Sequence, residues 1–167
     1  MKTVCQIFLG ILITISVATA QQCPPEFWPA GGGCFGVFGG AQDMQWPEAR
    51  QYCQDMIIPG WSADLAYFDD TTQFEAVAQA YQNVSSGTYP FMWVGIIRVD
   101  GQWQYVDGSP IPTSANIWSV GHPHDMNMHV YLDDVTISTA QHSWGRLYAT
   151  CTSGDFLPIY MCRAASQ

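Results

Sequence analysis

The chain has 167 residues, of which 48% are hydrophobic and 14% aromatic, with a formal net charge of −9 and only 5 Lys+Arg. This length predicts one globular domain, and the apolar content excludes intrinsic disorder. Nucleic-acid binding is excluded because phosphate neutralisation needs clustered Lys and Arg. Binding to an anionic membrane surface is disfavoured for the same reason.

The first twenty residues have the pattern of a secretory signal peptide. Lys2 provides a basic n-region, an apolar stretch begins at Ile7, and Ala18-Thr19-Ala20 has the small residues of a cleavage site. The apolar run is shorter than a membrane span needs, which argues against a membrane anchor. We therefore expect a signal peptide over residues 1–20 and one secreted, extracellular domain over residues 21–167, without a membrane anchor.

Cleavage after Ala20 changes both the charge and the cysteine count. The remaining chain has four Arg against 14 Asp+Glu, a formal charge of −10, and no Lys. Its five cysteines are Cys23, Cys34, Cys53, Cys151 and Cys162. In an oxidising compartment, this odd number implies two disulfides and one cysteine that is free, sequestered or paired with another chain.

The first half of the chain predicts a hairpin, two helices and a short strand. Two apolar flanks around a Gly-rich turn predict a hairpin over residues 23–38, with cysteines placed to staple its arms. Apolar residues at helical spacing predict one helix over residues 46–56 and a second from about residue 72 to 82. Residues 64–68, between these helices, have the pattern of a short strand.

The second half of the chain has the apolar pattern of strands. Residues 91–97 predict a buried strand, and residues 101–106 predict another, which begins and ends at Asp-Gly turns. Residues 109–128 form a long loop rich in Pro, Gly, His and Asn, and loops of this length are usually functional or disordered. Three short strands follow, near residues 129–132, 146–151 and 159–163. This order of elements predicts an α+β fold.

Five phrases of the chain, in the right order, resemble those of the C-type lectin-like domain family. They are Trp46-Pro47-Glu48-Ala49-Arg50-Gln51-Tyr52-Cys53, Asp64-Leu65-Ala66, Trp93-Val94-Gly95-Ile96, Gly101-Gln102-Trp103-Gln104-Tyr105-Val106-Asp107-Gly108-Ser109 and Tyr160-Met161-Cys162-Arg163. The resemblance covers residues 23–163 and implies two helices packed on short antiparallel sheets, with a long ligand-binding loop. A freestanding domain with an amino-terminal hairpin is similar to the long form of secreted, single-domain invertebrate lectins of innate immunity.

The resemblance also implies partners for four cysteines. The implied disulfides are Cys23–Cys34, the extra amino-terminal bridge of the family's long form, and Cys53–Cys162. The family's remaining bridge would need a partner for Cys151, but the aligned position is occupied by His129. Cys151 is therefore the odd cysteine, and it is either a buried thiol or the link in a disulfide-bonded dimer.

Sugar-binding members of the family hold one Ca²⁺ on the long loop through Glu-Pro-Asn or Gln-Pro-Asp, a later acidic residue and Trp-Asn-Asp. The matching places are His122-Pro123-His124, Asn127 and Trp144-Gly145-Arg146. Ca²⁺ prefers six to eight oxygen ligands, but two histidines, a glycine and an arginine stand here instead. The resemblance thus implies calcium with a degraded ligand set. The predicted ligand-binding loop comprises His122, Pro123, His124, Asp125, Asn127, Trp144 and Arg146.

The histidines of this loop also suggest a different metal. The candidate metal ligands are His122, His124, Asp125 and Asn127, and histidine with carboxylate suits Zn²⁺ better than Ca²⁺. The favoured alternative is a solvated polar loop whose histidines cap backbone groups, because the spacing matches no compact zinc signature. Pro123 is a candidate for a cis peptide bond, which only X-Pro bonds adopt at so low a cost.

The sequence predicts no catalytic residues and no enzyme. No Ser or Cys lies in a recognisable nucleophile motif, and Asp69-Asp70 is better explained as a helix cap, in which Asp70 and Gln73 resemble a capping box. Asn83 begins an N-glycosylation sequon, which predicts a glycoprotein. Trp118 and Trp144 flank the long loop and could stack on a sugar, although core packing is the favoured use of both.

Two functions remain open from the sequence. The first is a secreted lectin that binds carbohydrate or microbial surface glycans in innate immune recognition. The second is a metal-independent lectin-like domain that binds a protein or another non-sugar ligand. The replacement of oxygen ligands at residues 122, 124, 145 and 146 supports the second.

Overall fold

The structure is a computed structural model, and it describes residues 22–84, 92–112, 114–119, 121–123, 128–132, 147–150 and 157–167. Within these residues there are two helices and eight strands, and they confirm the α+β class. The elements are β1 (Trp28–Ala30), β2 (Gly33–Met44), α1 (Trp46–Gln54), β3 (Trp61–Leu65), α2 (Thr71–Val84), β4 (Met92–Val99), β5 (Gln102–Tyr105), β6 (His129–Leu132), β7 (Leu147–Thr150) and β8 (Leu157–Ser166).

The amino-terminal hairpin is formed by β1 and β2, as predicted. Gly31 and Gly32 form its turn with φ angles of 52° and 82°, which are values that glycine adopts without strain. The Cys23–Cys34 disulfide joins the segment before β1 to β2. β2 continues beyond the predicted end of the hairpin because it pairs antiparallel with β8 along most of its length.

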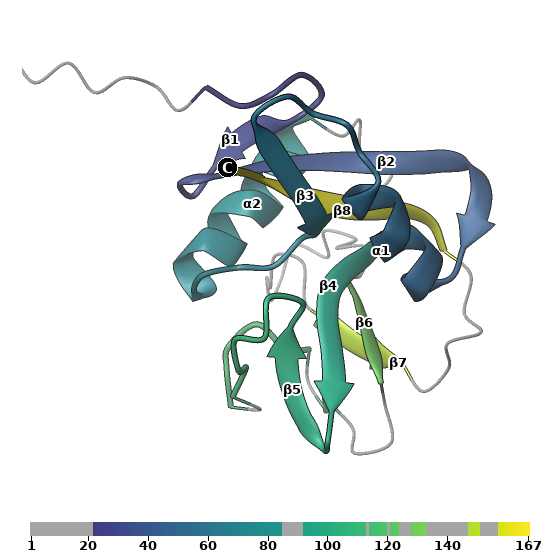
Figure 1. The fold of residues 1–167 in the computed structure, drawn as a ribbon. Coiled ribbons are helices and arrows are strands. Elements are labelled where there is room, and N and C mark those ends of the chain that lie inside the picture. The colour runs from purple at the N-terminus through teal and green to yellow at the C-terminus, as the bar shows by residue number, and fades with distance from the viewer. Residues whose placement is uncertain are drawn as a thin grey trace, which may run out of the picture.

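The strands of the described residues form one mixed sheet in the order β1-β2-β8-β4-β6-β7, with β3 paired to β8 and β5 paired to β4. β4 and β8 are parallel, whereas the sequence predicted only antiparallel pairing. Apolar periodicity predicts the strands themselves but not which strand lies beside which. Figure 1 shows β2 and β8 toward one end of β4 and β5 beside its other end, while β6 pairs with β4 from Met92 to Ile97.

Helix α1 buries the face that the sequence predicted, through Trp46, Ala49 and Cys53. The Cys53–Cys162 disulfide, with a Cα–Cα distance of 5.7 Å, joins this face to β8 across a sequence separation of 109 residues. Both disulfides implied by the family resemblance are therefore present. No helix in the described ranges combines the length and the apolar composition that crossing a membrane requires.

Helix α2 is capped by Asp70, as predicted, because the Gln73 backbone N–H donates to Asp70 Oδ1 at 2.7 Å. In a capping box, Gln73 would accept a hydrogen bond from the backbone N–H of Asp70. Here Gln73 Oε1 instead accepts from the backbone N–H of Asp69 at 2.9 Å, which differs from the prediction. The strand predicted over residues 64–68 also differs. It runs from Trp61 to Leu65, because these residues pair with β8 and the chain leaves the sheet after them.

The core lies on both sides of β4 and β8, because successive strand residues point to opposite faces. Val94 and Met161 belong to the core cluster that also contains residues of α2. Trp93 and Cys162 belong to a second cluster, which contains the buried residues of α1. Each helix therefore covers a different face of the same two strands.

Candidate functional site

The long loop begins as an ordered extension of β5. The backbone N–H of Ile111 donates to the carbonyl oxygen of Trp103 at 2.8 Å, and that of Tyr105 donates to Ser109 at 2.9 Å. Asp107 Oδ1 closes the turn by accepting from the N–H and the hydroxyl of Ser109, at 2.8 and 2.6 Å. The first residues of the predicted loop are thus fixed to the sheet.

Trp118 anchors the middle of the loop in the core. Its side chain is 6% exposed, its ring centroid lies 5.3 Å from that of Trp103, and its Nε1–H donates to Pro112 O at 3.3 Å. Core packing, the favoured prediction for Trp118, is confirmed, because too little of the ring is exposed to stack on a sugar. Trp118 is instead a residue that positions the loop.

His122 and Pro123 follow this anchor at the surface. The backbone N–H of His122 donates to Ser119 O at 2.9 Å, and Gly121 between them has a φ angle of 84°. The His122–Pro123 peptide bond is cis, which confirms the interpretation of Pro123. Both residues are half-buried, so the loop presents them partly to solvent on an anchored backbone.

The loop returns to the sheet next to β4. The Arg98 backbone N–H donates to Met128 O at 2.9 Å, immediately before β6 begins. His129 follows, and its side chain is 5% exposed, with its ring centroid 4.9 Å from that of Trp46. Burial lowers the pKa of His129 below its usual value. Its buried Nδ1 has no hydrogen-bond partner among the described residues, so His129 is a core residue rather than a surface ligand.

The other residues predicted for the loop lie outside the described residues. They are His124, Asp125, Asn127, Trp144 and Arg146, together with the odd cysteine Cys151. The structure therefore places only His122 and Pro123 of the predicted site. The backbone of Asn83 is described, and it lies in the last turn of α2.

Of the side chains predicted to bind a metal, the described residues contain only His122. They contain no group of three or more His, Cys, Asp or Glu side chains that could hold a metal. His122, beside the cis bond, offers imidazole nitrogen where Ca²⁺ prefers carboxylate or carbonyl oxygen. Asp125 and Asn127, the nearby oxygen donors in the sequence, lie outside the described residues.

An ion pair that no sequence pattern predicted fixes the start of α2. Arg163 Nη1 and Nη2 donate to the two carboxylate oxygens of Asp69 at 2.7 and 2.8 Å. The guanidinium also lies 4.2 Å from the Tyr67 ring centroid. The hydrogen bonds from Arg163 hold the pKa of Asp69 below its usual value. Of the Asp69-Asp70 pair, only Asp70 caps the helix, and no local sequence pattern indicated the distant arginine.

The sequence of the chain was compared with known families. The model of the family described as "Lectin C-type domain" matches residues 42–155, which is more than half of the chain. The chain belongs to the C-type lectin family. This confirms the family resemblance, and because members of this family are binding domains, it also confirms the prediction that the chain is not an enzyme.

This C-type lectin has a relative among receptors. It is 26% identical over 109 residues to asialoglycoprotein receptor 2 of Rattus norvegicus, a match that covers 65% of this chain and 32% of that protein. The chain therefore spans about a third of the length of this relative.

Two solved structures have the same fold at low sequence identity. The C-type lectin CEL-I from Cucumaria echinata has a TM-score of 0.67 and 17% identity, over 88% of this chain and 100% of that chain. Human lithostathine has a TM-score of 0.64 and 21% identity, over 87% of this chain and 100% of that chain. These likenesses confirm the C-type lectin fold.

Proposed function

We propose that this C-type lectin is a secreted protein that binds carbohydrate, including microbial surface glycans, in innate immune recognition. The observation that carries the proposal is that a loop whose first residues are hydrogen-bonded to β5 holds His122 and Pro123 partly exposed at the surface. The family resemblance puts the ligand-binding tip at this place. Two structural relatives support a glycan ligand: SPL-1 was solved with GlcNAc, and murine dendritic cell inhibitory receptor 2 with an N-glycan.

The proposed site uses a degraded calcium motif. C-type lectin domains commonly bind calcium, but His122 and His124 flank Pro123 and Arg146 replaces a further oxygen ligand. Asp125 and Asn127 are the remaining side-chain oxygen donors of the proposed loop. We therefore expect glycan binding that depends little on Ca²⁺. Zn²⁺ is the less favoured candidate metal for this site, proposed because imidazole suits Zn²⁺ better than Ca²⁺.

A glycan array and a pull-down with bacterial cells test the proposal. The secreted domain is applied to both, in buffer with Ca²⁺ and in buffer with a chelator. We expect a defined set of glycans to retain the protein in both buffers. If the folded protein binds no glycan and no cell in either buffer, the proposed function is wrong.

A second function is a metal-independent lectin-like domain that binds a protein or another non-sugar ligand. It is favoured by the imidazole of His122, which stands beside the cis bond in place of an oxygen donor. The glycan array, read together with a calorimetric titration with Ca²⁺, separates the two functions. Binding in the micromolar-to-millimolar range would favour a sugar site with calcium, whereas no heat of binding together with a silent glycan array would favour the second function.

The proposal includes three covalent features of the secreted form. Residues 1–20 are removed as a signal peptide, Asn83 carries a glycan, and Cys151 either remains a thiol or links two chains. The mass of the secreted protein before and after treatment with an N-glycosidase tests the first two. Non-reducing electrophoresis tests the dimer, and a monomer with one titratable thiol would contradict it.

A further inference from the structure

A second surface lies on the outer side of α1, opposite the buried face of the helix. We define this α1 face by Glu48, Tyr52 and Asp55, together with Ile57, which is the third residue after the end of the helix. The first three follow one another at spacings of four and three residues, so they lie on one side of the helix. Tyr52 is 52% exposed, and Ile57, just beyond the helix, is 97% exposed. Leaving such a large aliphatic side chain in water forgoes the stabilisation that its burial would provide.

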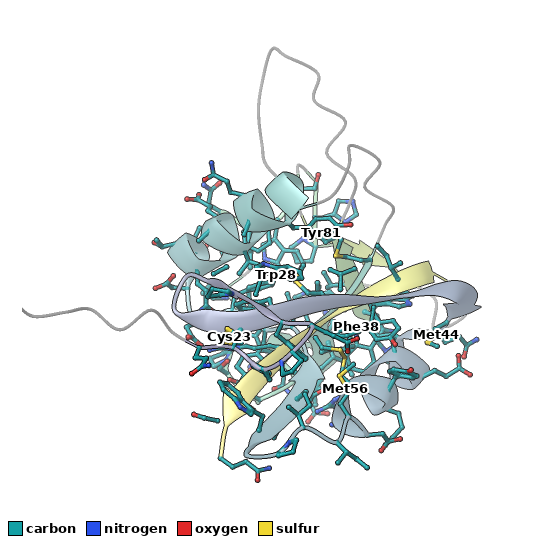
Figure 2. All side chains as sticks on the ribbon, turned by 90° about the horizontal axis from the view of Figure 1, so that it is seen from above. Cys23, Trp28, Phe38, Met44, Met56 and Tyr81 are labelled. Carbon is teal, nitrogen blue, oxygen red and sulfur yellow. A yellow bond between two sulfur atoms is a disulfide. The ribbon has the colours of Figure 1, made fainter. Side chains whose placement is uncertain are left out.

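The aromatic ring of this face is held in place from below. The Tyr52 ring contacts Tyr160 at a centroid distance of 5.5 Å and an interplanar angle of 60°. Tyr160 is itself buried and lies 6.2 Å from the Phe38 ring. Phe38, Met44 and Met56, labelled in Figure 2, pack against the core cluster that contains the buried residues of α1, and all three remain partly exposed. Methionines and aromatic rings of this kind are typical of docking surfaces.

The charge of the α1 face is negative and is not neutralised by the arginine of the same helix. Glu48 Oε2 accepts from the backbone N–H of Gln45 at 3.0 Å, and Asp55 Oδ1 accepts from Gln51 Nε2 at 2.8 Å. These neutral donors fix the carboxylates without cancelling their charge. Arg50 is only two residues from Tyr52, so it points to nearly the opposite side of the helix.

The remaining described arginines also lie elsewhere. Arg50 pairs with Asp64 of β3 at 3.0 Å, and Arg163 pairs with Asp69 at 2.7 Å. Arg98 Nε donates to Gly101 O at 3.2 Å, in the β4–β5 turn. Within the described residues, the α1 face therefore combines an exposed ring and an aliphatic side chain with two carboxylates.

We propose that the α1 face binds a basic protein segment. A Lys or Arg side chain of the partner lies over the Tyr52 ring between the carboxylates of Glu48 and Asp55, and an apolar side chain contacts Ile57. A cation gains both from the face of an aromatic ring and from neighbouring carboxylates. A second copy of this chain is the less suitable occupant, because each copy carries a net charge of −9 and the same acidic face.

The test uses a short synthetic peptide of arginines with interspersed leucines, and a control peptide in which glutamate replaces arginine. Binding to the whole secreted domain is measured by fluorescence anisotropy at low salt. The double variant E48Q/D55N removes both carboxylates but keeps their hydrogen-bond acceptors. Its matched control, E75Q/D100N, removes two exposed carboxylates from α2 and from the β4–β5 turn, so both variants have the same net charge.

We expect the arginine peptide to bind the wild type about tenfold more tightly than E48Q/D55N, with a change of less than about twofold for E75Q/D100N. I57S should weaken binding at an unchanged Tm, because Ile57 is almost fully exposed, whereas V99S at the exposed end of β4 should not change binding. Y52A should weaken binding about three- to fivefold.

Three results would overturn the proposal. The first is that the arginine peptide does not bind the wild type, and the second is that both double variants weaken binding equally, which indicates diffuse charge attraction. The third is a wild-type dimer that I57S dissociates in sedimentation, because the occupant would then be a second copy. E48Q/D55N leaves the long loop intact, so its glycan binding should be unchanged. Failure of the proposal for the α1 face is therefore distinguishable from failure of the proposed lectin function.

Discussion

Two regions of the molecule are held together by different kinds of interaction. The scaffold region, which comprises β1–β3, both helices and β8, contains the Cys23–Cys34 and Cys53–Cys162 disulfides and the Arg50–Asp64 and Arg163–Asp69 ion pairs. The loop region, which comprises β5, the described part of residues 109–128 and β6, is held by ring contacts and backbone hydrogen bonds. The scaffold is thus tied by covalent bonds, whereas the loop region depends on noncovalent packing and hydrogen bonds.

The largest effect should come from removing the Cys53–Cys162 disulfide. This bridge closes a sequence separation of 109 residues, whereas Cys23–Cys34 closes one of 11. In the chain-entropy account, C53A/C162A should lower the free energy of unfolding by about 4 to 5 kcal/mol, and C23A/C34A by about 3 kcal/mol. Urea unfolding of both double variants measures the difference. Equal losses would contradict the assignment of the longer bridge as the main tie of the scaffold.

Trp118 should be the most sensitive residue of the loop region. W118A removes a buried indole that contacts Trp103, so it should lower the free energy of unfolding by about 3 kcal/mol. It should also abolish glycan binding, because His122 would lose its anchor. W118F should recover most of the stability and part of the binding. Full glycan binding by W118A would show that the ring does not position the loop.

The loop region should weaken in mild acid before the scaffold does. Burial holds the pKa of His129 below its ordinary value of 6.5. The unfolded chain therefore binds a proton at a higher pH than the folded chain. The contribution of His129 to the free energy of unfolding is complete above about pH 6.5 and is lost as the pH falls. Unfolding free energies between pH 8 and pH 5 test this for wild type and H129F. The slope should be smaller in H129F, whereas identical slopes would contradict the assignment.

The smallest effect should come from Asp69, at much lower pH. The hydrogen bonds from Arg163 hold its pKa below the ordinary 3.8, so its contribution is present above about pH 3.8 and is lost as the pH falls through the folded pKa. D69N should therefore reduce the steepness of acid unfolding below pH 4. The effect should be modest because more than half of the Asp69 side chain is exposed. A D69N profile that matches wild type would show that the pair contributes nothing.

Local patterns predicted most of the scaffold. The spacing of Trp46, Ala49 and Cys53 predicted α1, and the glycine-rich turn predicted the hairpin, because both signals depend on neighbouring residues. The parallel pairing of β4 with β8 and the Arg163–Asp69 ion pair could not be read from such patterns. Both join residues far apart in the chain, and only the folded arrangement brings them together.

The site was predicted less completely than the scaffold. The family resemblance located the loop tip and suggested the cis bond at Pro123, which the structure has. The burial of His129 against Trp46 was not predicted, because an imidazole at the first residue of a strand gives no apolar signal of its own. The adjacent apolar pair Ile117 and Trp118 was a further sequence signal for core packing of Trp118, and both residues are buried.

We propose that the anchored loop at His122 recognises the glycan, while the scaffold holds this loop in place. The most direct measurement is a glycan array that compares wild type with H122A, after both have been shown to melt at similar temperatures. We expect that wild type binds a defined set of glycans on the array and that H122A does not bind them. A full glycan signal from H122A would contradict it.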